Sequence, residues 1–281
     1  MRRHVAAFIF LLVIPAGVRT YHYSWWSDNP QPYLDAIKKS SLTAPPKLTP
    51  GERIRAGIVT HHFLASGLMV RLFSALAAGS SPETIILIGP NHFHHGSANI
   101  SLSSLPWKTP FGILETDQRI VQQLKAATSL PEDPEAFTGE HSVGVLIPFV
   151  KYYFPRSRIV PILVDVNAQE SSLHALQGLL SSFLRNPQLL VVLSMDFSHD
   201  STAAIADTRD EQAQQVISAL DLSKTTELNV DCPKGLWLLL AALEDLGHVK
   251  VHVSEHTNSA QLTKKPNQAN VTSYFSIFFT K

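Results

Sequence analysis

Three short apolar runs of this 281-residue chain each end in a polar cluster that contains histidine. The first run is followed by Thr-His-His at residues 60–62, the second by Gly-Pro-Asn-His at 89–92, and the third by Ser-Met-Asp-Phe-Ser-His at 194–199. Neutral imidazole is a common metal ligand in proteins, and its second ring nitrogen needs an acceptor nearby. If the three runs are neighbouring strands, these residue types predict a shared metal site.

The histidines and the aspartate of these clusters suit different roles in such a site. His61 and His92 offer two nitrogen ligands, and Asp196 can orient one of the rings. His199 lies three residues after Asp196, close enough to serve as an acid or base in the same pocket. His141, which follows a glutamate at the start of a predicted helix, is a further candidate.

Cys232 is the single cysteine, so the chain cannot form an internal disulfide or a multi-cysteine zinc site. It precedes Pro233, a residue suited to the first position of a helix. A thiol just before a helix start is favoured as the thiolate, which is the form that binds metal. The alternative is that Cys232 is a small buried apolar residue, as lone cysteines often are.

Other histidines are expected to lie outside the site or at its margin. Residues next to a ligand usually point elsewhere, and histidines on predicted surface helices face solvent. These groups are the loop residues His62, His94 and His95, the helix residues His174 and His248, and the late-strand residues His252 and His256, of which His256 is nearest to the rim.

Apolar runs alternate with amphipathic stretches from residue 53 onward, which predicts an α/β fold with a mainly parallel central sheet and helices on both faces. In such sheets ligands bind beyond the carboxyl ends of the strands, where the histidine clusters are predicted to lie. The expected strands are 54–60, 84–88, 158–166, 189–194, 249–254 and 271–279, and the expected helices are 66–78, 116–127, 142–153, 168–184, 208–220 and 234–246.

The first residues form a separate region in this interpretation. In residues 1–26, Arg2 and Arg3 precede an apolar run, which is typical of a signal peptide or membrane anchor, so we expect an exported or membrane-anchored protein and otherwise a cytoplasmic one. A buried N-terminal helix is the alternative. Residues 27–50 are rich in proline and are interpreted as a linker with one short helix near 33–39. Residues 51–281 are then a single domain.

The amino-acid composition limits the classes of function that the protein can have. Lys and Arg number 23, as do Asp and Glu, and the isoelectric point is about 7.2. Apolar residues make up 44% of the chain, which fits a globular protein. The charge balance gives no electrostatic basis for binding nucleic acid, and none is expected as a partner.

The motifs taken together resemble a known family. Residues 58–62, 88–92, 140–142 and 194–199, in this order, resemble the landmarks of the Memo family, called AmmeMemoRadiSam system protein B in bacteria and archaea. Residues 109–112, 159–164 and 231–232 support the resemblance, which covers the chain from about residue 56 to the end. It implies a fold like that of the class III extradiol dioxygenases, an α/β sheet flanked by helices.

The resemblance also implies roles for site residues. The metal-binding histidines of the family fall on His61 and His92, and its cysteine ligand falls on Cys232. The residues His141, Asp196 and His199 match positions around that site.

Two imidazoles and a thiolate with open positions suit iron(II), copper or zinc, and we expect iron or copper ahead of zinc. The leading hypothesis is a metal-binding protein with redox or oxygen-related activity, although a thiolate in place of a carboxylate means that dioxygenase activity does not follow from the fold. The alternative is a non-catalytic module that binds a peptide, a small molecule or a metal. Zinc-dependent hydrolysis, with His199 or His141 as base, ranks lower because no His-Glu-x-x-His motif is present.

Overall fold

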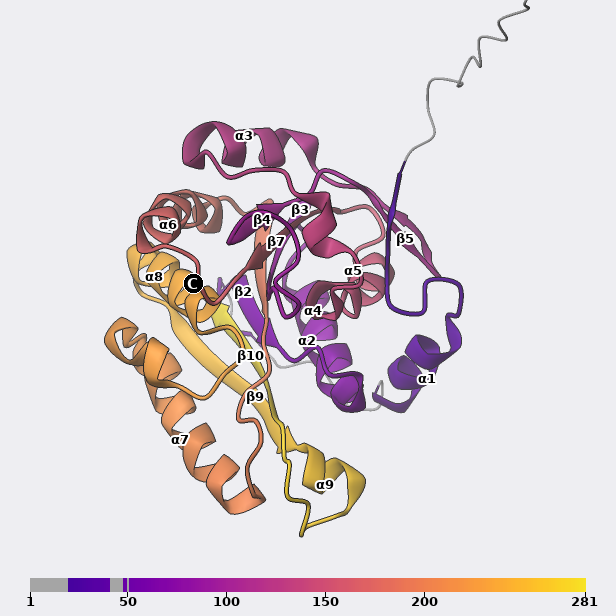
Figure 1. The fold of residues 1–281 in the computed structure, drawn as a ribbon, viewed down its shortest axis with the longest axis vertical. Coiled ribbons are helices and arrows are strands. Elements are labelled where there is room, and N and C mark those ends of the chain that lie inside the picture. The colour runs from indigo at the N-terminus through magenta and orange to yellow at the C-terminus, as the bar shows by residue number, and fades with distance from the viewer. Residues whose placement is uncertain (1–19, 41–47, 50) are drawn as a thin grey trace, which may run out of the picture.

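The computed structural model describes residues 20–40, 48–49 and 51–281. Within them, the main sheet has seven strands in the order β4-β7-β3-β8-β2-β10-β9 (Figure 1). Its strands are β2 (Ile54–Val59), β3 (Thr84–Pro90), β4 (Ile100–Leu102), β7 (Arg158–Val164), β8 (Leu189–Ser194), β9 (Lys250–Asn258) and β10 (Ser273–Thr280).

The four central strands β7, β3, β8 and β2 run parallel, and the outer strands β4, β10 and β9 are antiparallel to their neighbours. All residues of β3 and β8 are buried, as a parallel sheet covered on both faces requires. The edge strand β9 is half-exposed along most of its length. The structure therefore confirms an α/β fold with a mixed, mostly parallel sheet.

Helices cover both faces of the sheet (Figure 1). Successive residues of β3 alternate between them, with Ile86 and Ile88 in one hydrophobic cluster and Ile85 and Leu87 in the other. The first face is covered by α3 (Gln118–Thr128), α6 (Glu170–Arg185), α7 (Ala203–Ala219) and α8 (Pro233–Leu246), and the second by α1 (Gln31–Ser40), α2 (Ser66–Gly79) and α5 (Ile147–Tyr153). The short helices are η1 (Phe63–Ala65), η2 (Pro134–Phe137), α4 (His141–Gly144), η3 (Leu222–Glu227) and α9 (Ser259–Thr263).

The predicted strands and helices are all present with shifted ends, except that the helix expected at 142–153 is divided into α4 and α5. Pro148 lies in the first turn of α5 and has no N–H to donate to the carbonyl of Gly144, so a continuous helix would lack that bond. The Gly144 carbonyl instead accepts a hydrogen bond from the backbone N–H of Trp25 at 3.0 Å.

The N-terminal arm, which we define as residues 20–26, is part of the packed domain. Its strand β1 (His22–Tyr23) pairs with β5 (Trp107–Thr109), which pairs with β6 (Gly112–Leu114) in a second, three-stranded sheet. Helix α1 follows in the expected linker and buries Tyr33 completely against α2 and α5. The packed domain thus begins ahead of residue 51, where the sequence interpretation placed its start, because these short elements carry aromatic residues that fill the core.

The predicted signal or anchor falls mainly on residues 1–19, which lie outside the described residues. Among the residues that the structure describes, no helix combines the length and the apolar character needed to cross a membrane.

Candidate metal centre

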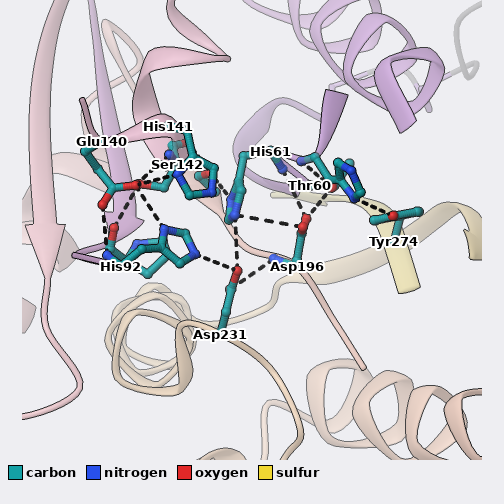
Figure 2. A network of polar contacts seen from close by, with 12 residues as sticks. Thr60, His61, His92, Glu140, His141, Ser142, Asp196, Asp231 and Tyr274 are labelled. Carbon is teal, nitrogen blue, oxygen red and sulfur yellow. Dashed lines mark hydrogen bonds and ion pairs between the residues drawn. The ribbon is translucent and has the colours of Figure 1, made fainter. Parts of the chain in front are cut away.

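The predicted convergence of strand ends is present. Strands β3, β8 and β2 are parallel neighbours in that order, so the residues that follow them meet at one edge of the sheet. His92 follows β3, Asp196 follows β8 and His61 follows β2 (Figure 2). The ring centroids of His61 and His92 are 4.9 Å apart.

His141 joins these two histidines from the start of α4. Its ring centroid is 4.4 Å from that of His92 and 5.3 Å from that of His61. Gly89 allows this approach, because a Cβ there would come within 2.8 Å of the Ser142 hydroxyl, which donates to the Pro90 carbonyl. One ring nitrogen from each histidine lies within 4.8 Å of the others, the spacing of a three-histidine metal group.

Hydrogen bonds fix the orientation of two of the rings (Figure 2). The Ser194 hydroxyl donates to the Ser142 carbonyl, so it accepts from His61 Nδ1–H at 2.9 Å. The Glu140 carboxylate accepts from His92 Nδ1–H at 2.9 Å and from the His92 backbone N–H at 2.8 Å. In both neutral rings the lone pair is therefore on Nε2, as in metal-binding histidines held by an outer acceptor.

Asp231 lies where both of these Nε2 atoms point, and sequence reasoning did not select it. Its Oδ1 accepts from the Asp196 backbone N–H at 3.0 Å, while its Oδ2 is buried without a hydrogen-bond partner among the described residues. Oδ2 lies 3.2 Å from His61 Nε2 and 3.4 Å from His92 Nε2. Atoms that bind one ion at about 2.0–2.2 Å are about 2.8–3.6 Å apart, so each of these two distances is that expected between two ligands of one cation.

The site attracts positive charge. Burial acts to lower the pKa of His92, but the close carboxylates of Asp231 and Glu140 outweigh it and raise this pKa to about 9. Burial likewise acts to lower the pKa of His61, and the charges of Asp196 and Asp231 raise it above the ordinary value. Without a proton or a metal ion between them, the two Nε2 lone pairs and the carboxylate oxygen would repel one another.

The pKa values of His141 and Asp231 are shifted in directions that also favour a bound cation. Burial and the positive charges of His61 and His92 lower the pKa of His141 to about 4, so its ring is neutral and keeps a lone pair. Burial acts to raise the pKa of Asp231, but His61 and His92 hold it well below its usual range. Both groups are thus in the forms that bind metal.

Asp196 is the second aspartate that contacts His61. Its Oδ1 accepts from the Thr60 hydroxyl and, at 3.2 Å, from the His61 backbone N–H, while its Oδ2 is 3.8 Å from His61 Nε2. Asp196 thus holds the loop of His61, whereas the Nδ1 atom of the ring is held by Ser194. His61, Asp196 and Asp231 form a second group of potential ligands.

Cys232 is not brought into either ligand group. Its side chain is buried among apolar residues under the first turn of α8, close to Leu193, and a Cβ on Gly235 would come within 2.5 Å of its sulfur. Burial and the charge of Asp231 raise the pKa of the thiol well above its usual range. The structure therefore assembles a group of histidines and aspartates in place of the expected His/His/Cys set, because neighbouring residues 231 and 232 point in different directions.

His199 lies on the loop that follows β8, and its backbone N–H donates to the Asn229 side chain at 2.8 Å. Burial lowers the pKa of His62. His62 Nδ1 is 2.6 Å from the Tyr274 hydroxyl, and the His62 backbone N–H donates to the Thr60 hydroxyl at 3.1 Å, so His62 is joined to the loop that carries His61.

Four other histidines have partners elsewhere. His94 pairs with Asp165, and His256 pairs with Asp210. His174 packs edge-on against Trp237, and His252 is bonded to Thr280.

The fold and the site together define an α/β protein with a histidine- and aspartate-lined candidate metal centre. The family model described as Memo-like protein matches residues 20–278, so the chain belongs to the Memo-like protein family. The match begins in the N-terminal arm, in agreement with its packing.

Relatives and one solved structure are similar to the chain. A MEMO1 family protein of Pyrobaculum aerophilum is 29% identical over 246 residues, and one of Pyrobaculum arsenaticum is 30% identical over 245 residues; each alignment covers 83% of this chain and 85% of the relative. The crystal structure of an uncharacterized Escherichia coli K12 protein superposes with a TM-score of 0.54 and 12% identity, covering 79% of this chain and 98% of that one. This last likeness shows the fold alone.

Proposed function

We propose that the protein holds a divalent metal ion between His61, His92 and Asp231, with His141 beside them. The observation that carries this proposal is the unpartnered Asp231 Oδ2, placed 3.2 Å and 3.4 Å from the two ring nitrogens. Two histidines and one carboxylate with open positions are typical of non-haem iron(II) sites. We therefore favour iron(II) and an oxygen-related or redox activity.

The ligand types in the site also rank the metals that were expected from the sequence. Without the sulfur of Cys232, the soft ligand that would favour copper is gone, and imidazole with carboxylate suits iron(II) or zinc. When bound, the ion would supply Lewis-acid or redox chemistry to a ligand in its open positions.

The other side chains position the ligands and handle protons. Ser194 and Glu140 hold the Nδ1 atoms of His61 and His92, and this leaves each Nε2 free for the ion. His199 is the acid or base in this proposal, since it is partly exposed, lies three residues after Asp196 and is in neither ligand group.

The first test is elemental analysis of anaerobically purified protein. Wild type is expected to contain about one metal ion per chain, and His61→Ala, His92→Ala and Asp231→Ala are expected to lose most of it. The control is Cys232→Ala, which is expected to keep the metal because the sulfur faces the core. Full metal content in Asp231→Ala together with loss in Cys232→Ala would refute the ligand set.

Oxygen chemistry is tested separately on the iron-loaded protein. Oxygen uptake with a panel of catechols, lost in His199→Ala while metal content is kept, is expected for a catalyst. Metal binding without any oxygen uptake would favour the alternative of a non-catalytic module that binds a small molecule, peptide or metal.

A further inference from the structure

We infer that a cavity between α6 and α8 binds a small aromatic carboxylic acid in its ionised form. This α6–α8 cavity has a volume of about 360 Å³, at the lower end of the range of small-molecule sites, about 300–1,000 Å³. Its lining includes three apolar residues and three polar ones, namely Leu173, Leu222, Trp237, Glu170, His174 and Lys234. None of them belongs to a ligand group of the candidate metal centre, so the inference does not depend on the proposed function.

The walls of the α6–α8 cavity are packed parts of the fold. Helices α6 and α8 lie side by side on the first face of the sheet (Figure 1), and η3 packs on α8. Leu173 is buried in the hydrophobic cluster beneath these helices, while Leu222 and Trp237 pack against the margin of the same cluster. The cavity is therefore already formed before a ligand enters it.

Two rings give the cavity an aromatic surface. Trp237 on α8 and His174 on α6 meet edge-on, with their ring centroids 4.9 Å apart and their planes at 87°. An aromatic ring that enters the cavity covers apolar carbon and also gains contacts with these rings. An aliphatic group of the same size gains only the first of these, so a flat aromatic ligand is preferred.

Lys234 supplies a positive charge to the same cavity. It is half-buried in the first turn of α8, three residues before Trp237, so the two side chains lie on one side of that helix. Its Nζ donates to the Ala168 carbonyl, and an ammonium group has two further N–H groups to donate. In the described part of the chain, Lys234 has no carboxylate partner. A ligand carboxylate would complete its hydrogen bonds with a charge-assisted pair.

Glu170 limits the charge of the ligand. It lies in the first turn of α6 and lines the same cavity as Lys234. Its carboxylate repels a second negative charge, since like charges brought together disfavour the wrong partner. The α6–α8 cavity thus selects a flat monocarboxylate over a dicarboxylate or a phosphate ester.

The experiment compares a carboxylate with its neutral isostere. 2-Naphthoate and 2-naphthamide are titrated into the full chain, and binding is followed by isothermal titration calorimetry. Wild type is expected to bind 2-naphthoate with a Kd below about 1 mM and the amide about tenfold more weakly. Lys234→Gln is expected to weaken naphthoate binding about tenfold with naphthamide binding unchanged. Trp237→Leu is expected to weaken the binding of both probes about tenfold.

Lys224→Gln is the matched control. Lys224 is an exposed lysine on η3 that pairs with Asp221 and does not line the α6–α8 cavity. This variant is expected to bind both probes like wild type. Unchanged naphthamide binding in Lys234→Gln, and cooperative thermal unfolding of Trp237→Leu, show that the variants have folded.

A further variant separates the α6–α8 cavity from the candidate metal centre, because a carboxylate can also bind a metal ion. His92→Ala is expected to keep the naphthoate affinity of wild type. If naphthoate binding is lost in His92→Ala but kept in Lys234→Gln, the acid binds at the metal centre and the inference is overturned. Absence of binding by wild type up to 1 mM, or equal affinities for acid and amide, also overturns it and leaves the proposed metal site untouched.

Discussion

His92 in the candidate metal centre and His22 in the N-terminal arm both lie against other rings, but their surroundings differ in charge. His92 is placed between the carboxylates of Glu140 and Asp231, and its pKa is raised to about 9. His22 is buried against Trp107 at 4.9 Å, and burial lowers its pKa to about 4. Its Nε2 has only the hydroxyl of a serine, Ser103, at 2.6 Å.

The difference shows what turns a packed histidine into a cation site. Burial alone removes water from the charged form and keeps the ring neutral, as at His22. Two close carboxylates reverse this effect at His92, so the same side chain attracts a proton or a metal ion. The three predictions below test whether the surroundings, rather than the histidine itself, set this behaviour.

The largest effect is expected from pH on the folding of the N-terminal arm. Because the folded-state pKa of His22 lies below the unfolded value of about 6.5, its stabilising effect is present above pH 6.5 and is lost as the pH falls toward 4. The loss amounts to about 3 kcal/mol in the free energy of unfolding. His22→Gln cannot gain this proton, so urea denaturation at pH 7 and pH 4 should show a correspondingly smaller decrease for the variant. Equal decreases in the two proteins would remove the contrast with His92.

A second prediction concerns the carboxylate that holds His92. Glu140 accepts from the His92 ring and backbone and also from the Ser142 backbone N–H at 2.8 Å, so it positions both His92 and the start of α4. Glu140→Gln is expected to weaken metal binding by about 10- to 100-fold, measured by competition with a chromophoric chelator. The exposed Glu135→Gln is the control and should bind metal like wild type. Wild-type affinity in Glu140→Gln would show that the carboxylate does not tune the site.

The smallest effect is expected at the neutral acceptor of His61. Ser194→Ala removes the hydroxyl that accepts from His61 Nδ1–H, and metal affinity should fall by up to about tenfold in the same assay. Ser276→Ala, a buried serine on β10 outside the cluster, is the control. A loss larger than that of Glu140→Gln would contradict the view that charge matters more than hydrogen bonding alone.

Much of the fold could be predicted from sequence because buried parallel strands are continuous apolar runs. Strand β3 and strand β8 were expected within two residues of their observed ends, and helices α2 and α8 within one. The N-terminal arm and the strands β4, β5 and β6 could not be predicted, since two or three residues carry too little periodicity. Their stability comes from partners such as Trp107 and Tyr33 that are distant in sequence.

The candidate site was likewise predicted from the sequence only in part. His61, His92 and Asp196 follow apolar runs, and this position in an α/β sheet already brings them together. His141 was a weaker candidate, because its approach depends on the small residue Gly89 in a strand far away in the sequence. Asp231 lies two residues before α8, which begins at Pro233. Its position next to Cys232, a predicted ligand, was the one signal in the sequence that could have identified it.

The sequence by itself determined which chemistry is available: imidazoles and carboxylates at the ends of strands that hydrophobic burial forces into one sheet. Only the tertiary structure decided that Asp231 faces the histidines while Cys232 faces the core, and that Trp25 is fixed beside His141. The physical reason is that the direction of a loop side chain is set by packing and hydrogen bonds with distant segments. These bonds include those from the Asp196 N–H to Asp231 and from the Trp25 N–H to Gly144, and no local pattern of residues records them.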